Sequence, residues 1–542
     1  MNRETEMHFS QVPKMETKRS KFYIPYDHKT TFDGGKLVPL GVWEVLPGDT
    51  CEMNVSSIVR MTTPLYPTMD NAFMDVYFFY ERNINLWDHW AEFQGENKIT
   101  KWEQTVQYQI PQITAPAGGW AEDTIADHLG IPTKISNISI SHLPFRMYCK
   151  VWSDWFRDEN LKDNVYWTTG DATTSGANTG NYVTTAQCGA ELLPVAKIHD
   201  YFTSALPSPQ KGPSIGVPIG TDAPVRALNK TFTPENQPLT WYSTTQDQPL
   251  PTGNYNVMAN NSGTIAKTAD ASGNIGYIAP NNLYADLSQA TLATINQLRE
   301  AYAVQRYYEA LARGGSRYVE TLRSIWSVTP LDASLHRSEY LGGYRTPINI
   351  SQVLQTSSTD AVSPQGNTGA YSYTPDSQEV FTKSFEQHGY LMCVACIRTE
   401  KTYQQGIERF WSRKSPFDFY IPQLANIGEQ AILNKEIYAT GTATDDQAFA
   451  YQEAYADYRY KPSTVSGKMR SNASGTLDSW HYAENYNSLP TLSTSWIDED
   501  NSVIQRTLAV QNEPQFIGDF YFNTTWVREM PVYSVPGLSG HY

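Results

Sequence analysis

The sequence has few charged residues, few cysteines and no long apolar run. Charged residues make up 18% of the 542 residues, below the quarter or so that is usual in soluble domains. The five cysteines are too few to form a disulfide framework for a chain of this length. No apolar run approaches the ~20 residues of a membrane span, and the first residues lack the pattern of a secretory signal. We therefore expect a protein made and used in a cytosol-like compartment.

Common signatures of catalysis and metal binding are also missing. The sequence contains no GxxxxGK[ST], no GxGxxG that opens a helix, no HExxH and no GxSxG. Cys393 and Cys396 have CxxC spacing, but they lie in an apolar stretch without a second pair, which is typical of buried structural cysteines. The pair His199-Asp200 has no nucleophile motif beside it, and the acidic run 498–500 is typical of a solvated turn. We expect no enzyme, no bound metal and no cofactor.

What the chain does have is a large number of aromatic residues and an acidic charge balance. It contains 35 Tyr and 14 Trp, and its formal net charge is −15. An acidic chain does not bind nucleic acid through its overall field, although a local basic patch can still do so. Many Tyr and Trp with few charges are typical of protein–protein interfaces. The composition therefore indicates a β-rich protein with large neutral surfaces.

The strongest strand signals lie near the two ends of the sequence. Residues 36–45, 52–61 and 72–80 have the patterns of strands, and the last is apolar on both alternations except at Asp75, which predicts a strand buried on both faces. Residues 516–526 alternate between apolar and polar positions and predict a half-buried strand. Residues 379–385 and 390–398 flank His388-Gly389 as the arms of a hairpin would, and residues 417–421 predict a short strand. An antiparallel barrel, and a jelly roll in particular, pairs strands that are this distant in sequence.

Helices and a long polar interval separate these strands. Residues 86–93 predict one or two helical turns, and residues 141–161 predict a helix after Pro144. Residues 286–326 predict two helices, the first capped by Asp286 and stopped at Gly314-Gly315. The interval 168–283 is rich in Gly, Pro, Asn, Ser and Thr, so we interpret it as a surface insertion with its own short strands and turns. Residues 1–30 are interpreted as an irregular arm.

Two local clusters depart from the acidic balance. The arm carries four closely spaced basic residues, and a second stretch interleaves basic with aromatic residues, as a stacking surface for single-stranded nucleic acid does. Arginine and aromatic residues are equally enriched in protein interfaces, and a basic arm can simply be solvated, so both interpretations stay open. The first cluster is Lys14, Lys18, Arg19 and Lys21; the second is Arg398, Lys401, Tyr403, Arg409, Phe410, Trp411, Arg413 and Lys414.

Several segments resemble one known family. They are HFSQVPKMETKRSKF, KTTFDGGKLVPLGVWEVLPGDT and MDNAFMDVYFFYERNINLW in the first hundred residues, then SEYLGGYRTPINISQVLQT, GYLMCVACIRTEKTYQQGIERFWSRKSPFDFYIPQLANIGEQAI and MPVYSVPGLSGHY. Together they resemble the major capsid proteins of the gokushoviruses, small single-stranded DNA phages of the Microviridae. The interval 168–283 matches no pattern of that family.

The resemblance implies a fold and an assembly. It implies a mainly β protein, an eight-stranded antiparallel jelly roll with long loop insertions and a few helices, and about 60 copies in a T=1 icosahedral shell. We accordingly expect an N-terminal arm at 1–30 inside the shell and a first part of the jelly roll with a helical insertion at 31–167. Residues 168–283 are then the variable insertion that forms a protrusion at the three-fold axes, and residues 284–542 hold further helices and the remaining strands.

Partners follow from the same resemblance. They are other copies of the chain, packaged single-stranded DNA, a small basic DNA-binding protein, minor pilot or scaffolding proteins and a host surface receptor. About 60 chains of net charge −15 oppose the packing of DNA unless basic groups lie inside, so we expect Lys14, Lys18, Arg19 and Lys21 to face the DNA. The protein is then part of the virion and is assembled in the cytoplasm of the bacterial host.

Two other functions remain open. A glycan-binding or glycan-processing β protein would use Trp and Tyr to stack on sugars, and processing would need two carboxylates roughly 5 to 10 Å apart in a cleft; a panel of glycans would detect it. A single-stranded DNA-binding protein would use the 398–414 stretch, and salt-dependent binding by isolated subunits would detect that.

Overall fold

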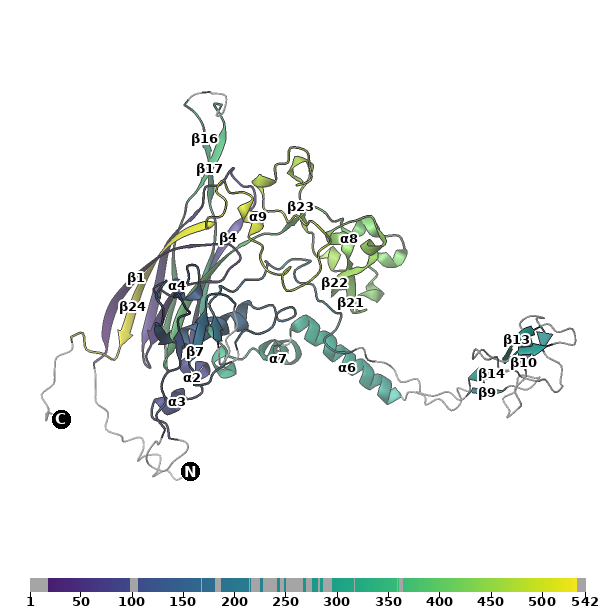
Figure 1. Cartoon of the computed structure of the whole chain (residues 1–542), viewed down its shortest axis with the longest axis horizontal. Coiled ribbons are helices and arrows are strands. Elements are labelled where there is room, and N and C mark those ends of the chain that lie inside the picture. The colour runs from purple at the N-terminus through teal and green to yellow at the C-terminus, as the bar shows by residue number, and fades with distance from the viewer. Residues whose placement is uncertain are drawn as a thin grey trace. The chain divides into compact units, whose positions relative to one another are not determined.

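The computed structural model describes residues 18–97, 106–166, 168–180, 187–213, 295–315, 317–357 and 364–533, with residues 215 and 359 and the short strands between 225 and 285. The chain contains two compact units, Met1–Pro209 with Ala312–Tyr542, and Gln210–Leu311. Figure 1 shows the ribbon and the labels of its elements.

The first unit contains a four-stranded antiparallel sheet in the order β1-β24-β3-β18. Its strands are β1 (Ser20–Phe32), β24 (Phe516–Arg528), β3 (Thr50–Met61) and β18 (Thr374–Ser384). β1 and β24 pair along their whole length, from Ser20 opposite Arg528 to Phe32 opposite Phe516. The expectation of an irregular arm up to residue 30 is therefore wrong from Ser20 onward, because alternate side chains such as Phe22 and Tyr26 pack against the core.

A second antiparallel sheet of four strands has the order β15-β4-β19-β2. Its strands are β15 (Glu339–Pro347), β4 (Ala72–Arg82), β19 (Gly389–Thr399) and β2 (Val38–Val45). β4 and β19, the two central strands, are buried almost throughout, as the continuous apolar run 72–80 predicted. The strands predicted at 36–45, 52–61 and 516–526 correspond to β2, β3 and β24.

The two sheets enclose one hydrophobic core. On β24, Phe516, Phe520, Phe522 and Trp526 are fully buried on one alternation, as predicted, while Ile517 and Tyr521 on the other are half exposed. The ring of Phe522 lies 5.1 Å from Trp43 of β2 and 6.3 Å from Phe78 of β4, centroid to centroid, so the sheets meet face to face. The first sheet pairs the first strand, β1, with the last, β24, and the second sheet places β4 between β15 and β19, which are far from it in the chain, as a jelly roll does. The predicted mainly β, antiparallel capsid-type fold is confirmed.

Two local strand predictions are wrong. Residues 379–385 and 390–398 do not form a hairpin, because β18 pairs with β3 in the first sheet and β19 pairs with β4 and β2 in the second. The connection between them crosses from one sheet to the other, with Phe385 buried and its carbonyl oxygen bonded to the amide of Gly48 at 2.8 Å. Residues 416–418 form a 3-10 turn rather than a strand, because Ser415 caps a turn that Pro416 opens.

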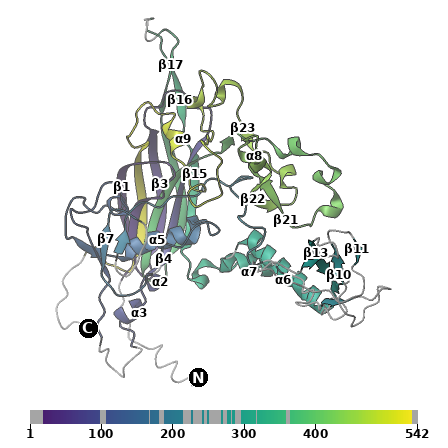
Figure 2. The ribbon, with the colours of Figure 1, turned by 45° about the vertical axis from the view of Figure 1, so that its right-hand side comes forward.

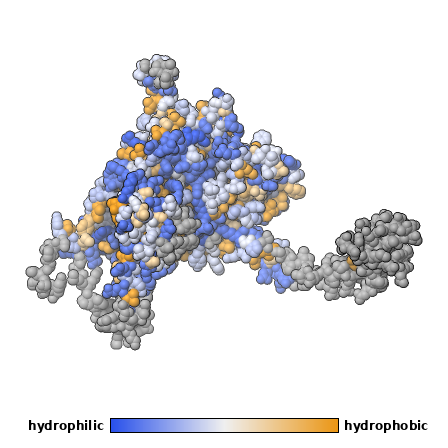
Figure 3. All heavy atoms as spheres, viewed as in Figure 1, coloured by the Kyte–Doolittle hydropathy of each residue, from blue (hydrophilic) through white to orange (hydrophobic). Residues whose placement is uncertain are grey.

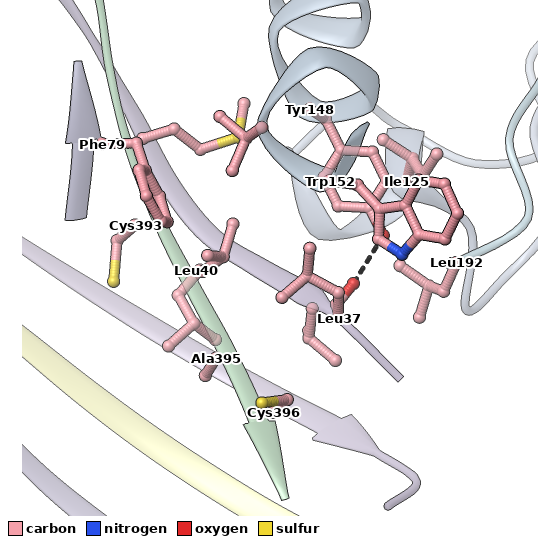
Figure 4. Close-up of a cluster of buried hydrophobic side chains, with 14 of the residues drawn as sticks. Leu37, Leu40, Phe79, Ile125, Tyr148, Trp152, Leu192, Cys393, Ala395 and Cys396 are labelled. Carbon is pink, nitrogen blue, oxygen red and sulfur yellow. Dashed lines mark hydrogen bonds between the residues drawn. The ribbon is translucent and has the colours of Figure 1, made fainter. Parts of the chain in front are cut away.

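Part of the chain between β4 and β15, within residues 83–209, packs against the second sheet. It contains α5 (Leu143–Val151), continued by one π-helical turn over Trp152–Phe156, which corresponds to the helix predicted after Pro144. The Tyr148 hydroxyl donates to the backbone oxygen of Leu37 at 2.6 Å, as Figure 4 shows, and thereby fixes α5 against the chain that enters β2. The other elements are α2 (Asn83–Leu86), α3 (Trp90–Phe93), α4 (Ile125–His128), β5 (Gln112–Thr114), β6 (Ser139–Ser141), β7 (Thr174–Ala177) and β8 (Gln187–Gly189).

The unit Gln210–Leu311 begins later and ends later than the expected insertion 168–283. Residues 168–209 belong to the first unit, where Leu193 and Val195 are buried in the main core. Asp286, the expected helix cap, lies outside the described residues. The short strands of the second unit are β9 (Val225–Ala227), β10 (Trp241–Ser243), β11 (Gln248–Pro249), β12 (Lys267–Ala269), β13 (Ile275–Pro280) and β14 (Leu283–Ala285).

Two helices and a hairpin follow these short strands. α6 (Ile295–Gly314) ends at Gly315, whose φ of +86° suits the predicted glycine stop. α7 (Tyr318–Trp326) comes next. The hairpin of β16 (Ile350–Leu354) and β17 (Thr368–Ser372) extends beyond the sheets at the end opposite α2 and α3 (Figures 1 and 2).

A second insertion, residues 400–515, separates β19 from β24 and shares a small core with residues 201–205. Phe202, Ile432, Ile437 and Ile497 are among its buried residues. Its elements are β20 (Thr402–Tyr403), β21 (Glu429–Leu433), α8 (Asn434–Ile437), β22 (Ala448–Glu453), β23 (Ser463–Thr464) and α9 (Ser502–Gln505). Among the described residues of the whole chain, no helix combines the length and apolar character needed to cross a bilayer.

Candidate functional site

The basic arm residues lie at one end of the first sheet. Lys18, Arg19 and Lys21 are exposed at the start of β1, an edge strand, while Lys14 lies outside the described residues. Arg19 donates to the backbone oxygen of Gly48 in the β2–β3 turn, which ties the arm to that turn. The sheet thus gathers three exposed cations on a short length of backbone, and such a group can contact phosphates.

The second predicted cluster, 398–414, is not one continuous basic surface. Arg398 lies on β19 beside the buried carboxylate of Asp75 on β4, with 2.5 Å between its Nη2 and Oδ2. Arg345 of β15 contacts the other oxygen of Asp75, also at 2.5 Å from its Nε. The hydrogen bond with Asp75 raises the pKa of Arg345. Two guanidinium groups therefore neutralise the one carboxylate that interrupts the apolar strand, and Arg398 acts within the fold.

Lys401 is buried in an ionic network rather than exposed. Its Nζ lies 2.9 Å from Glu499 and 3.1 Å from Glu484, and its side chain is 1% exposed. Lys197 completes the network at 3.2 Å from Glu484. Burial opposes these charges, but the two carboxylates outweigh it and the pKa of Lys401 is raised. Two cations and two anions thus balance inside the protein, and no free charge is left for a ligand.

Other members of the stretch are also engaged inside the chain. Tyr403 is buried and its hydroxyl donates to Asp200 at 2.6 Å. Arg409 donates to the backbone oxygen of Ala431 at 2.7 Å and pairs with Glu436 at 3.2 Å. Arg413 pairs with Asp457 and lies over the ring of Tyr458, 4.3 Å from its centroid. Only Lys414, among the five cations predicted here, is an exposed residue.

The aromatic residues of the same stretch behave in the opposite way. Phe410 is 44% and Trp411 is 72% exposed, and their ring centroids are 4.6 Å apart. Phe417, Phe419 and Tyr420, which the prediction left out, are 71%, 52% and 49% exposed. These five residues are called the aromatic patch. Figure 3 shows hydrophobic residues on the side of the molecule where Figure 1 places α8 and β21. Grouped exposed rings of this kind are typical of a surface that associates with protein.

A hollow of about 430 Å³ lies beside the aromatic patch and is lined in part by Phe410, Tyr458 and Tyr460. Sequence reasoning missed it, because its lining comes from segments near 201, 403–413, 436 and 457–464. The only signal was the abundance of Tyr between 440 and 500.

The isolated chemical motifs are occupied by structural contacts. Cys393 and Cys396 are both fully buried in β19, and burial raises the pKa of the Cys396 thiol to about 12. Asp498 pairs with Lys162, and Asp500 accepts from Ser502. Among the residues that the structure describes, no group of three or more His, Cys, Asp or Glu is arranged to hold a metal ion.

Comparison with known proteins identifies the family. Residues 10–538 match the family model described as "Capsid protein (F protein)". The chain is 42% identical to the capsid protein VP1 of Bdellovibrio phage phiMH2K over 100% of this chain and 99% of that protein. It is 40% identical to the capsid protein VP1 of Chlamydia phage 1 and 39% identical to that of Spiroplasma virus 4, each over 98% of this chain and 97% of the relative. The predicted resemblance to gokushovirus capsid proteins is therefore confirmed, and the chain belongs to the phage capsid protein (F protein) family.

Proposed function

We propose that about 60 copies of this chain close a T=1 icosahedral shell around a circular single-stranded DNA genome. The observation that carries the proposal is the aromatic patch, since five exposed rings on an otherwise well-packed unit need a partner surface. Family membership indicates a structural rather than an enzymatic role, and it indicates self-association into a capsid. Heterologous contacts between identical subunits form closed rings, and hence a closed shell, when the rotation that relates neighbouring subunits is a whole fraction of a full turn.

Lys14, Lys18, Arg19 and Lys21 contact the packaged DNA, so the DNA lies on the side of the shell that carries the start of β1. The support is the exposure of Lys18, Arg19 and Lys21 at a sheet edge. With a net charge of −15 per chain, these few cations do not neutralise a genome. A small basic DNA-binding protein supplies the remaining charge, and the chain works with minor pilot or scaffolding proteins.

The part of the expected insertion 168–283 that lies in the compact unit Gln210–Leu311 supplies the outer surface that meets a host receptor, as a protrusion at the three-fold axes. Its support is that residues Gln210–Leu311 form a compact unit of their own. A unit of this kind can vary without disturbing the core. The virion is assembled in the cytoplasm of the bacterial host.

Assembly of purified subunits tests the proposal. The chain is expressed alone and together with its neighbouring phage genes, and particle size is measured by sedimentation and electron microscopy. Closed shells of one diameter that protect single-stranded DNA from nuclease support the function. Irregular aggregates, or shells with no preference for single-stranded DNA, would contradict it.

A further inference from the structure

The hollow beside the aromatic patch has the chemistry of a site for an uncharged, apolar segment. Its floor is formed by Tyr201, Phe202 and Tyr403, which are 5%, 2% and 4% exposed, and its rim by Phe410, Tyr458 and Tyr460, which are 44%, 51% and 49% exposed. This set of six rings is called the aromatic hollow.

The polar groups of the aromatic hollow are already satisfied by the chain itself. The Tyr201 hydroxyl donates to Glu436 at 3.0 Å, and that of Tyr403 donates to Asp200 at 2.6 Å. The floor therefore presents ring faces rather than free hydroxyl groups. Each cation of the lining also has a carboxylate partner: Arg409 with Glu436, Arg413 with Asp457, Arg459 with Glu453 and Lys461 with Glu408. A phosphate would have to displace these partners, whereas a neutral segment would not.

The last residues of the chain have the matching composition. Residues 530–542, MPVYSVPGLSGHY, contain no Lys, Arg, Asp or Glu, and they include two prolines among apolar and aromatic residues. Met530, Val532 and Tyr533 are 43%, 59% and 83% exposed, so much of their apolar surface is left uncovered by their own subunit. Proline-containing segments dock in aromatic-lined grooves because their extended backbone loses little entropy on binding. Residues 530–542 are called the tail segment.

The tail segment leaves the sheet far from the aromatic hollow of its own chain. The insertion 400–515 departs after Thr399 and returns at Phe516, the first residue of β24. β24 has 13 residues and so spans about 40 Å before the tail segment begins. At that far end the Arg528 guanidinium donates to the backbone oxygen of Glu44 at 2.8 Å, and its Nε lies 3.1 Å from the carboxylate of Asp49. The tail segment thus starts at the opposite end of the sheet, and a neighbouring subunit can bring a hollow to it.

We propose that the tail segment of one copy docks in the aromatic hollow of a second copy and so links neighbouring subunits. This inference rests on the proposed assembly and adds the partner segment to it. Neutral apolar residues meet neutral ring faces, and Pro531 and Pro536 keep the docked backbone extended. The aromatic patch, which adjoins the hollow, is then covered at the edge of the same contact.

Binding of a synthetic peptide tests the docking. A fluorescent peptide of residues 530–542 is titrated onto unassembled full-length subunits and followed by anisotropy. We expect saturable binding that falls at least about tenfold with Phe410→Ser or with Tyr460→Ser. Phe93→Ser is the matched control, because Phe93 is 38% exposed, close to the 44% of Phe410, and it neither lines the hollow nor belongs to the aromatic patch. It should leave affinity within about twofold, and urea unfolding shows which variants keep the fold.

Two results would overturn the docking. One is a peptide that does not saturate wild-type subunits. The other is a peptide that binds the Phe410→Ser and Tyr460→Ser subunits as well as the wild type, since the tail segment would then dock elsewhere. If one of these variants does not fold, the other decides.

Isotope mixing tests whether the contact joins two copies. Equal amounts of ¹⁵N-labelled and unlabelled chain, each with a photo-crosslinking residue in place of Tyr533, are assembled and irradiated. Crosslinks between labelled and unlabelled peptides from residues 406–413 or 457–464 support docking on a second copy. Crosslinks confined to one isotope would overturn it. If wild-type shells form but neither peptide binding nor mixed-isotope crosslinks are seen, only this contact is refuted. If the wild-type chain never assembles, the proposed function is refuted.

Discussion

Replacement of Lys401 by Met is expected to destabilise the subunit by about 3–5 kcal/mol. The Nζ group lies 2.9 Å from Glu499 and 3.1 Å from Glu484, and all three side chains are nearly inaccessible to solvent. At an effective dielectric constant near 20, each contact contributes about 5 kcal/mol of attraction, which offsets the cost of burying the charges. Without Lys401 the carboxylates stay buried, with Lys197 as the remaining cation. The free energy of unfolding is measured by urea denaturation of unassembled subunits.

Two further variants make the Lys401 prediction specific. Lys401→Met combined with Glu499→Gln should recover part of the loss, because the second change removes the charge that the first leaves unpaired. Lys414→Met is the control, since Lys414 is exposed, and it should change stability by less than about 0.5 kcal/mol. A loss below about 1 kcal/mol for Lys401→Met, or additive effects in the double variant, would refute the network.

Three further changes test other parts of the account. Burial lowers the pKa of His142 to about 3, so between pH 7 and pH 5 the unfolded chain binds a proton that the folded chain does not. The free energy of unfolding should therefore fall by about 2 kcal/mol from pH 7 to pH 5. The His142→Gln variant, followed by its urea midpoint at each pH, should not show this part of the fall. Trp411→Ser should leave the unfolding midpoint unchanged but raise the concentration at which subunits assemble about tenfold or more, measured by light scattering; unchanged assembly would exclude Trp411 from the interface. Replacing Lys18 and Lys21 with Gln should make the slope of log K for single-stranded DNA binding against log salt concentration less steep by about 0.7 per lost phosphate contact. An unchanged slope would show that these two residues do not contact DNA.

The strands of the sheets could be predicted from sequence because their burial leaves a local pattern. The run 72–80 is apolar on both alternations and became a central strand, and the alternation of 516–526 became a strand with one buried face. Which strands pair is not local information. β18 and β19 follow each other in the chain, yet β18 pairs with β3 in the first sheet and β19 pairs with β4 in the second.

The basic–aromatic stretch shows the same limit at the level of single residues. Sequence composition could not separate Arg398 and Lys401 from Trp411, because the carboxylates that pair with the two cations lie as far away as Asp75 and Glu499. One signal was present: a lone carboxylate in an apolar strand, Asp75, requires a cation inside the fold. Exposed rings remained after the cations were paired, which favours a protein interface over a DNA surface.

The most direct test of the central claim is the size distribution of particles formed by the purified chain, measured by analytical sedimentation and electron microscopy at increasing subunit concentration. The account predicts closed shells of a single diameter whose mass corresponds to about 60 chains of 61.1 kDa. A chain that remains a stable monomer at every concentration, with or without single-stranded DNA and its neighbouring phage proteins, would contradict it.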